Sequence, residues 1–214
     1  TTWCTDFSAG TYTGNLVNSI IRDCGGGGIL NGSDSGGDLV ESGNVTVTNT
    51  LIFKMGLMAS AIASYENLII QNSIIYDAPY GLLCKYESPP NLGAITSTFN
   101  CFYAVTTPYE SDDSAPLPVG LDDLLNMDPL FVDMDANNNL LTDLTLQPTS
   151  PCIDTGNYSP IFNDLDGSRN DMGIYGGSNS WINTLGVNVT NLEISPEIVG
   201  PGGTITIQAT GTVE

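Results

Sequence analysis

The 214-residue sequence contains no histidine and only four lysine and arginine residues, against 24 aspartate and glutamate residues. The absence of histidine excludes Ser-His-Asp and Cys-His catalytic sites within the chain, and it removes the commonest metal ligand. The formal net charge of −20 makes nucleic acids and anionic membrane surfaces poor partners, because like charges repel. No apolar run reaches the roughly 18 residues of a membrane-spanning helix, so direct membrane insertion is not expected.

Four stretches repeat one phrase, in which an asparagine is flanked by apolar residues at alternating positions. The asparagines are Asn18, Asn49, Asn72 and Asn100, and they lie 31, 23 and 28 residues apart. A loose period of this length is typical of solenoid proteins. The alternation has a period of two, which predicts strands rather than helices.

Alignment of the four phrases on their asparagines brings similar residues together. Large apolar residues stand two positions after the asparagine: Ile20, Leu51, Ile74 and Phe102. Small residues stand one position after it: Ser19, Thr50, Ser73 and Cys101. Parallel stacking places equivalent residues about 4.8 Å apart, so the phrases predict columns of like residues along a solenoid axis.

This pattern resembles the right-handed parallel β-helix of the pectate-lyase-like kind. The resemblance implies an all-β fold, a right-handed single-stranded parallel β-helix with an irregular C-terminal cap and a short β-sandwich-like tail. It also implies a structural ladder at one bend, in which the amides hydrogen-bond to one another and to the turn backbone. The ladder residues would be Asn18, Asn49, Asn72 and Asn100.

Three motifs follow the repeats in a fixed order: DPLF at residues 128–131, LQPTSPCIDTG at 146–156 and DLDGSRNDMGIYGG at 164–177. The trio resembles the closing segment of bacterial surface β-helix proteins, which implies that this part turns across the final coil and ends the solenoid. Arg169 stands among several acids of the third motif, so we expect a structural ion pair there. Its candidate partners are Asp164, Asp166 and Asp171.

The predicted organisation has three parts. Residues 1–110 form the coils, which we expect to continue upstream, and residues 111–183 form the final coil and the cap. Residues 184–214 contain two alternating segments that resemble the start of an immunoglobulin-like sandwich. Such a domain needs on the order of 100 residues, so the sandwich would be incomplete here.

One column of charged residues is a candidate catalytic site. Asp23, Lys54 and Asp77 each lie five positions after a ladder asparagine. A solvated charge ladder is the structural interpretation, because a lysine between two carboxylates relieves repulsion. The resemblance to polysaccharide lyases implies the alternative, in which Lys54 abstracts a proton and carboxylates hold calcium.

A second candidate calcium site has the D-x-D-x-N opening of a calcium loop, at Asp133, Asp135 and Asn137. Asn138 stands where an EF-hand needs glycine, and Leu144 stands where it needs the bidentate glutamate. An ordinary acidic turn is therefore the competing interpretation. No other cofactor is implied.

Five cysteines are present without any CxxC spacing, and an odd number leaves at least one outside an internal disulfide. Cys4 and Cys24 are a candidate disulfide in an oxidising compartment. Cys101 replaces a small residue of the repeated phrase, so we expect a buried thiol that packs as a small hydrophobe.

These features predict a non-catalytic, adhesin-like region of a large secreted or cell-surface bacterial protein. Its expected partners are a polysaccharide or cell-surface glycan and other domains of the same protein. The candidate sugar-stacking rings are Tyr65, Tyr76, Tyr80, Tyr86, Tyr103 and Tyr109, and rim packing is their alternative role. The alternative function is a fragment of a polysaccharide lyase or glycoside hydrolase.

Overall fold

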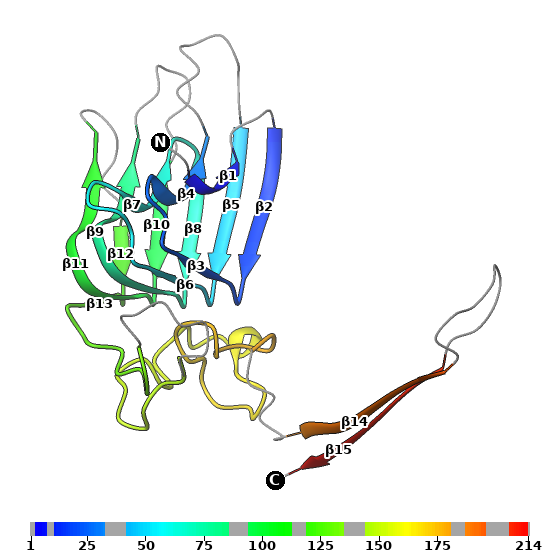
Figure 1. Ribbon diagram of the computed structural model, residues 1–214. Helices are drawn as coiled ribbons and strands as arrows, with labels where there is room; N and C mark the ends of the chain where they lie inside the picture. The colour runs from blue at the N-terminus through cyan, green and yellow to red at the C-terminus, as the bar shows by residue number, and fades with distance from the viewer. Residues whose placement is uncertain are drawn as a thin grey trace, which may run out of the picture. The chain divides into compact units, whose positions relative to one another are not determined.

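The computed structural model describes residues 3–7, 11–32, 42–85, 94–112, 119–134, 144–180, 187–195 and 206–213. Parallel strands stack as a β-solenoid (Figure 1), which confirms the predicted all-β, parallel fold class. The chain divides into two compact units, residues 1–181 and residues 182–214. Among the described residues, no helix is long and apolar enough to cross a membrane.

The first wall of the solenoid is a five-stranded parallel sheet. Its order is β12 (Val119–Leu121), β10 (Ile95–Thr98), β8 (Asn67–Gln71), β5 (Ser42–Thr48) and β2 (Thr11–Val17). Buried and exposed side chains alternate along β5 and β8, since one side faces the interior of the solenoid and the other faces outward. The predicted period of two therefore describes this wall well.

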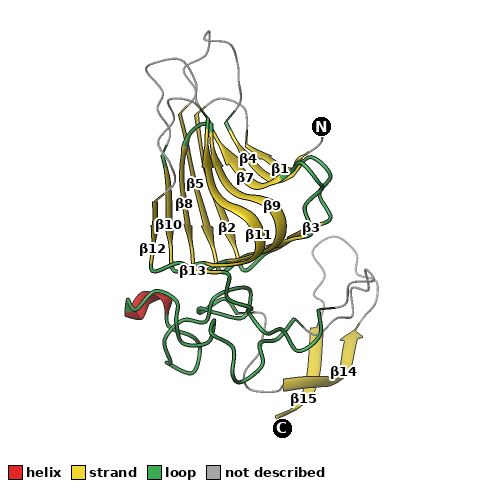
Figure 2. Ribbon diagram, turned by 90° about the vertical axis from the view of Figure 1, so that its left-hand side faces the viewer, coloured by secondary structure: helices red, strands yellow, loops and turns green. Residues whose placement is uncertain are grey.

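The second wall is an eight-stranded sheet that bends along its length (Figure 2). Its main path is β1 (Trp3–Phe7), β4 (Gly27–Asn31), β7 (Ser60–Ser64), β9 (Ile74–Cys84), β11 (Cys101–Ser111) and β13 (Leu124–Leu125). Two short strands, β3 (Ile20–Arg22) and β6 (Leu51–Phe53), complete it. The strand β9 pairs with β6 near its start and with β7 near its end, so it spans the bend that separates those two strands.

Left-handed backbone conformations explain why asparagine and aspartate recur at the two bends. Asn18, Asn49 and Asn72 have φ of 44°, 49° and 51° where the first wall turns into the second. Asp23 and Asp77 have φ of 56° and 52° at the bend within the second wall. Asparagine and aspartate tolerate this conformation better than other residues with a side chain, so the repeated phrase encodes backbone geometry.

The fourth repeat aligns one residue away from the predicted position. Cys101 pairs with Ile74, which places Phe99 beside Asn72, and Phe99 carries the left-handed conformation with φ of 56°. The prediction that Asn100 continues the column of Asn18, Asn49 and Asn72 is therefore wrong. Because successive side chains point to opposite faces, this shift sends Phe102 into the interior and Cys101 outward.

Two hydrophobic cores result. The inner core fills the solenoid and includes Ile52, Ile75 and Phe102. The second core lies on the outer side of β6, β9 and β11, where Leu51 and Ile74 pack against an irregular stretch that we call the lateral segment, residues 144–180. The lateral segment contains one 3-10 turn, η1 (Pro160–Phe162), and its Leu146 forms an isolated antiparallel bridge with Phe131.

The second unit contains an antiparallel pair of strands, β14 (Val187–Ser195) and β15 (Thr206–Val213). The register shifts between Val189 and Asn191, as it does at a β-bulge. The sequence predicted two segments of alternating apolar and polar residues here, and the two strands correspond to them. The immunoglobulin-like identity remains a prediction.

Candidate functional site

The asparagines of the first bend hold the lateral segment. The Nδ2 of Asn18 donates to the carbonyl oxygens of Ile174 and Gly176, at 2.9 and 2.8 Å. The Nδ2 of Asn49 donates to the carbonyl oxygens of Asp171 and Gly173, at 2.9 and 3.1 Å. These asparagines thus satisfy backbone acceptors of a segment more than 120 residues away in the chain.

Asn72, the third ladder residue, binds the lateral segment through its side-chain and backbone oxygens. The Oδ1 of Asn72 accepts a hydrogen bond from the backbone N–H of Asn157 at 2.7 Å, and the carbonyl oxygen of Asn72 accepts one from Gly173 at 2.8 Å. Within the described residues, Asn49 and Asn72 form no hydrogen bond with each other. The expected amide-to-amide bonding is replaced at these two positions by contacts with the lateral segment.

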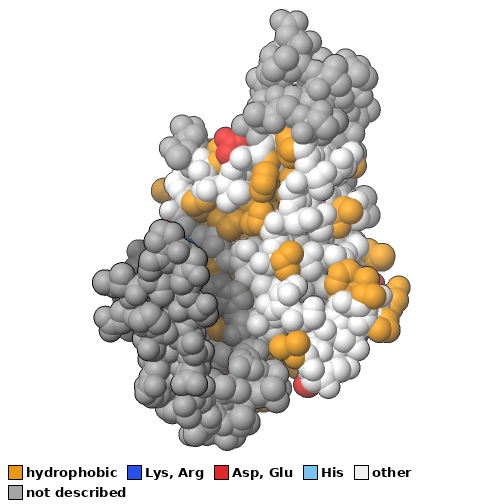
Figure 3. Space-filling view, turned by 90° about the vertical axis from the view of Figure 1, so that its right-hand side faces the viewer, with side chains coloured by type: hydrophobic (Ala, Val, Ile, Leu, Met, Phe, Trp, Pro, Cys, Tyr) orange, Lys and Arg blue, Asp and Glu red, His pale blue; other side chains and the backbone are white. Residues whose placement is uncertain are grey.

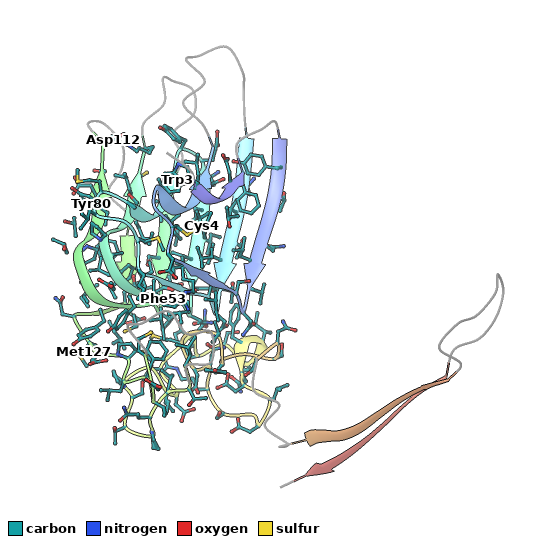
Figure 4. The ribbon with its side chains drawn as sticks, viewed as in Figure 1. Trp3, Cys4, Phe53, Tyr80, Asp112 and Met127 are labelled. Carbon is teal, nitrogen blue, oxygen red and sulfur yellow. A yellow bond between two sulfur atoms is a disulfide. The ribbon has the colours of Figure 1, made fainter. Side chains whose placement is uncertain are left out.

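The lateral segment lies along the side of the solenoid. Its contacts begin at Asn18 of the first repeat and extend to the fourth, where the ring of Tyr158 packs edge-on against Phe99 at 5.6 Å. Figure 4 shows Phe53 of β6 at the level where this segment meets the strands. We expected this part to turn across the final coil and end the solenoid, whereas it lies along several coils and covers their apolar outer residues.

Asn100 belongs to a different, inward-facing polar column. The backbone N–H of Thr50 donates to Ser73 Oγ at 3.1 Å, and the N–H of Ser73 donates to Asn100 Oδ1 at 2.8 Å. The N–H of Asn100 donates in turn to Asp123 Oδ1 at 2.7 Å. Each side chain thus accepts from the backbone of the preceding coil, which satisfies donors at a buried bend.

Asp123 ends this column in a buried hydrogen-bond network. Its Oδ2 accepts from Ser97 Oγ at 2.5 Å and from the hydroxyl of Tyr109 at 2.6 Å. Burial raises the pKa of Asp123, although these hydrogen bonds oppose the shift. The pKa of the Tyr109 hydroxyl is also raised, by burial first and by its bond to Asp123 second. Tyr109 is therefore engaged inside the fold and is not placed for sugar stacking.

The candidate catalytic column has the predicted alignment. Arg22 pairs with Phe53 and Phe53 pairs with Tyr76, so the residues that follow them, Asp23, Lys54 and Asp77, occupy equivalent bends. The Oδ2 of Asp23 forms an ion pair with the Nε of its neighbour Arg22 at 2.5 Å. The carboxylate of Asp23 is thus already paired within its own coil.

Arg169 does not form the predicted ion pair with an acid of the described residues. Its Nε donates to the carbonyl oxygen of Gly156 at 2.6 Å, and its Nη2 donates to that of Thr155 at 2.9 Å. Its guanidinium carbon also lies 5.8 Å from the centre of the Phe99 ring. Arg169 therefore joins two parts of the lateral segment through backbone acceptors and packs on the fourth repeat.

The acids of this motif accept backbone donors instead. The two oxygens of Asp164 accept from the N–H groups of Gly177 and Asp171, at 2.5 and 3.0 Å. The Oδ1 of Asp171 accepts from the N–H of Asp154 at 2.7 Å. Burial raises the pKa of Asp171 to about 6, and the nearby carboxylates of Asp164, Asp154 and Asp166 add to the shift.

The candidate calcium loop is described only in part. Asp133 is exposed, while Asp135 and Asn137 lie outside the described residues. In the part of the chain that the structure describes, no three histidine, cysteine, aspartate or glutamate side chains are grouped so that they could hold a metal ion.

Two of the remaining candidate sugar-stacking tyrosines, Tyr76 and Tyr103, pack against other aromatic rings. Tyr76 contacts the rings of Tyr103 and Phe131, with centroids 5.6 and 6.2 Å apart. Tyr65 and Tyr80 are half-buried, and Figure 4 marks Tyr80 on β9. Tyr86 lies outside the described residues. The packing of Tyr76 corresponds to the rim-packing alternative.

A shallow groove crosses the outer side of the five-stranded sheet. Its lining comes from β5, β8 and β10 and from Ala94, and it consists of Asn44, Val45, Thr46, Asn67, Leu68, Ile69, Ala94 and Thr96. The five strands of this sheet contain no charged residue, although the protein carries a net charge of −20. Figure 3 looks onto the β2 edge of this sheet, where few of the described side chains are charged.

No motif of the sequence singles out this groove. The signal was nevertheless present, because the polar partners in the alternating pattern of β5, β8 and β10 are asparagine, threonine, serine and glutamine rather than charged residues. Amide and hydroxyl groups both donate and accept hydrogen bonds. A surface of this kind can therefore match a ligand that is rich in hydroxyl groups and carries no charge.

The fold and the groove define this protein as a parallel β-solenoid with a segment fastened along its side and an uncharged outer wall. Comparison with protein-family models, with curated proteins and with solved structures gave no match. The resemblance to pectate-lyase-like β-helices therefore rests on the sequence patterns and the parallel solenoid architecture.

Proposed function

We propose that this chain is a non-catalytic β-solenoid region of a secreted or cell-surface bacterial protein, and that it binds a neutral glycan in the groove of the five-stranded sheet. The other domains of the same protein, including an immunoglobulin-like module begun by β14 and β15, would be its covalent neighbours. The observation that carries the proposal is the uncharged, amide- and hydroxyl-lined groove on an otherwise acidic protein.

The chemistry of the groove supports a sugar ligand. Asn44, Asn67 and Thr96 present side-chain donors and acceptors at the outer surface, where sugar hydroxyl groups can exchange water for protein hydrogen bonds. Ile69, which is 46% exposed, offers an apolar contact for the C–H face of a sugar ring. An acidic polysaccharide is the poorer ligand, because the net charge of −20 would repel it.

The disulfide between Cys4 and Cys24 supports the proposed extracellular location. Its Cα atoms are 5.8 Å apart, within the usual range for a bridged pair. Disulfides persist in oxidising environments such as the periplasm, the cell surface and the extracellular medium.

A binding panel tests the proposal. Affinity electrophoresis or calorimetry would compare soluble neutral polysaccharides, such as glucans, mannans and xylans, with polygalacturonate and alginate. We expect binding to at least one neutral polymer and a loss of about tenfold or more in Thr46→Arg, because an arginine would fill the middle of the groove.

The matched control is Leu121→Arg, which places the same side chain on the same sheet outside the groove. It should bind like the unmodified protein. Equal losses in both variants, or preference for the acidic polymers, would contradict the proposal.

The alternative is a polysaccharide lyase or glycoside hydrolase fragment, and the alignment of Asp23, Lys54 and Asp77 is the observation that favours it. An assay for reducing ends and for unsaturated uronate products over the same panel separates the two functions. Product that disappears in Lys54→Ala would establish the enzyme, whereas binding without product agrees with the non-catalytic proposal.

A further inference from the structure

Three cysteines outside the Cys4–Cys24 disulfide are buried, and two of them share one core. Cys84 belongs to the inner core of the solenoid. Cys101, on β11, and Cys152, in the lateral segment, both belong to the second core, and both side chains are 0% exposed. The two residues thus come from opposite sides of the boundary between the solenoid and the lateral segment.

Within this core the Cys152 side chain is the largest cause of the raised pKa of the Cys101 thiol, and the Sγ of Cys101 also lies 3.2 Å from the carbonyl oxygen of Met127. The backbone holds both residues in place: the N–H of Cys101 donates to Ser73 at 2.9 Å, and the carbonyl oxygen of Cys152 accepts from Met172 at 2.9 Å. A disulfide requires the sulfur atoms to approach each other to about 2.05 Å. Strand pairing and the lateral segment already bring the two residues into one buried core.

We propose that Cys101 and Cys152 form a second disulfide, which covalently fastens the lateral segment to the fourth coil. The Cys4–Cys24 disulfide provides independent support, because it implies maturation where disulfides persist. The reaction is thiol–disulfide exchange with a low-molecular-weight disulfide. The two protein thiols lose two protons and two electrons and form one S–S bond, while the reagent's S–S bond is reduced to two thiols.

Burial determines when this reaction takes place. The neighbouring Cys152 thiol raises the pKa of the Cys101 thiol most and burial raises it further, so the reactive thiolate is scarce in the folded protein. The bond therefore forms while the lateral segment docks or transiently opens. Reduced, folded protein should oxidise slowly, whereas protein that refolds in the presence of the disulfide reagent should acquire the bond.

The test is a count of free thiols. The full chain is refolded in a mixture of reduced and oxidised glutathione, then denatured, alkylated and weighed by mass spectrometry. We expect one alkylated cysteine per chain, Cys84, because the other four of the five are bridged. Non-reducing peptide mapping should recover a linked pair of peptides that contain Cys101 and Cys152. Three alkylated cysteines, or a linkage that involves Cys84, would overturn the proposal.

Two variants sharpen the count. Cys84→Ala should leave no alkylated cysteine, whereas Cys101→Ala should leave two, at Cys84 and Cys152. Equal counts in the two variants would contradict the pairing. Peptide mapping of the unmodified protein decides the question even if one variant fails to fold.

Discussion

The outer sides of the two walls of this solenoid differ in what covers them. On the second wall, the outward side chains of Leu51 and Ile74 are 0% and 1% exposed, because the lateral segment packs over them. On the five-stranded sheet, the outward side chain of Ile69 is 46% exposed. Both walls are built from parallel strands in the same stack, so the difference arises from the side chains.

The sequence of each wall encodes its degree of cover. Consecutive apolar residues occupy β6 (Leu51–Phe53) and the start of β9, so both faces of these strands are apolar and both must be buried. Apolar and polar residues alternate in β5, so one face is left to the solvent. The covered side gives the protein stability, and the open side is available for a ligand.

The largest expected effect comes from a truncation in the second core. Ile74→Ala should lower the free energy of unfolding by about 2–5 kcal/mol, because it removes a buried side chain and leaves a cavity beneath the lateral segment. The matched change on the open wall, Ile69→Ala, should cost less than about 1 kcal/mol. Urea unfolding curves measure both, and equal losses would mean that the lateral segment does not cover Ile74 in solution.

A smaller effect is expected where an asparagine binds the lateral segment. Asn49→Gly keeps the left-handed backbone accessible but leaves the carbonyl oxygens of Asp171 and Gly173 without their donor, which should cost about 1–3 kcal/mol. Asn49→Ala should cost about 1 kcal/mol more, because alanine strains the backbone at φ of 49°.

Asn44→Ala on the open wall is the control for the asparagine variants, and it should change the free energy of unfolding by less than about 0.5 kcal/mol. If Asn49→Gly proved as harmless as this control, the role of Asn49 would be to set the bend alone.

Much of the solenoid was predictable because it depends on local patterns. The alternating residues of β5 and the recurring Asn18, Asn49 and Asn72 indicated parallel strands and a repeated bend. The fourth repeat misled the alignment, because Phe99 occupies the left-handed position that asparagine holds elsewhere. The polar column indicates the correct register, because the side chains of Asn100 and Asp123 both accept hydrogen bonds from the backbone of a neighbouring coil.

The lateral segment could not be placed from its motifs alone. Its prolines and glycines predicted an irregular stretch, but its contacts with Asn18 and Asn49 join residues far apart in the chain. The charges of Arg169 and Asp164 suggested an ion pair. In the fold, Arg169 donates to a backbone carbonyl oxygen and Asp164 accepts from backbone N–H groups. The apolar runs of β6 and β9 would have indicated that a second layer covers them.

The smallest expected effect concerns the pH dependence of the covered side. The pKa of Asp171 in the folded protein, about 6, lies above its ordinary value of 3.8. The folded state therefore binds a proton at Asp171 more tightly than the unfolded state does. The stability that this protonation contributes is present below pH 3.8 and is lost as the pH rises through about 6. Asp171→Asn should weaken the fall in urea midpoint between about pH 4 and about pH 6.

Asp166→Asn is the matched control, because hydrogen bonds from Ser168 lower the pKa of this exposed carboxylate and its contribution has the opposite sign. A slope reduced equally by both variants would show that the environment of Asp171 does not raise the pKa of its carboxyl group.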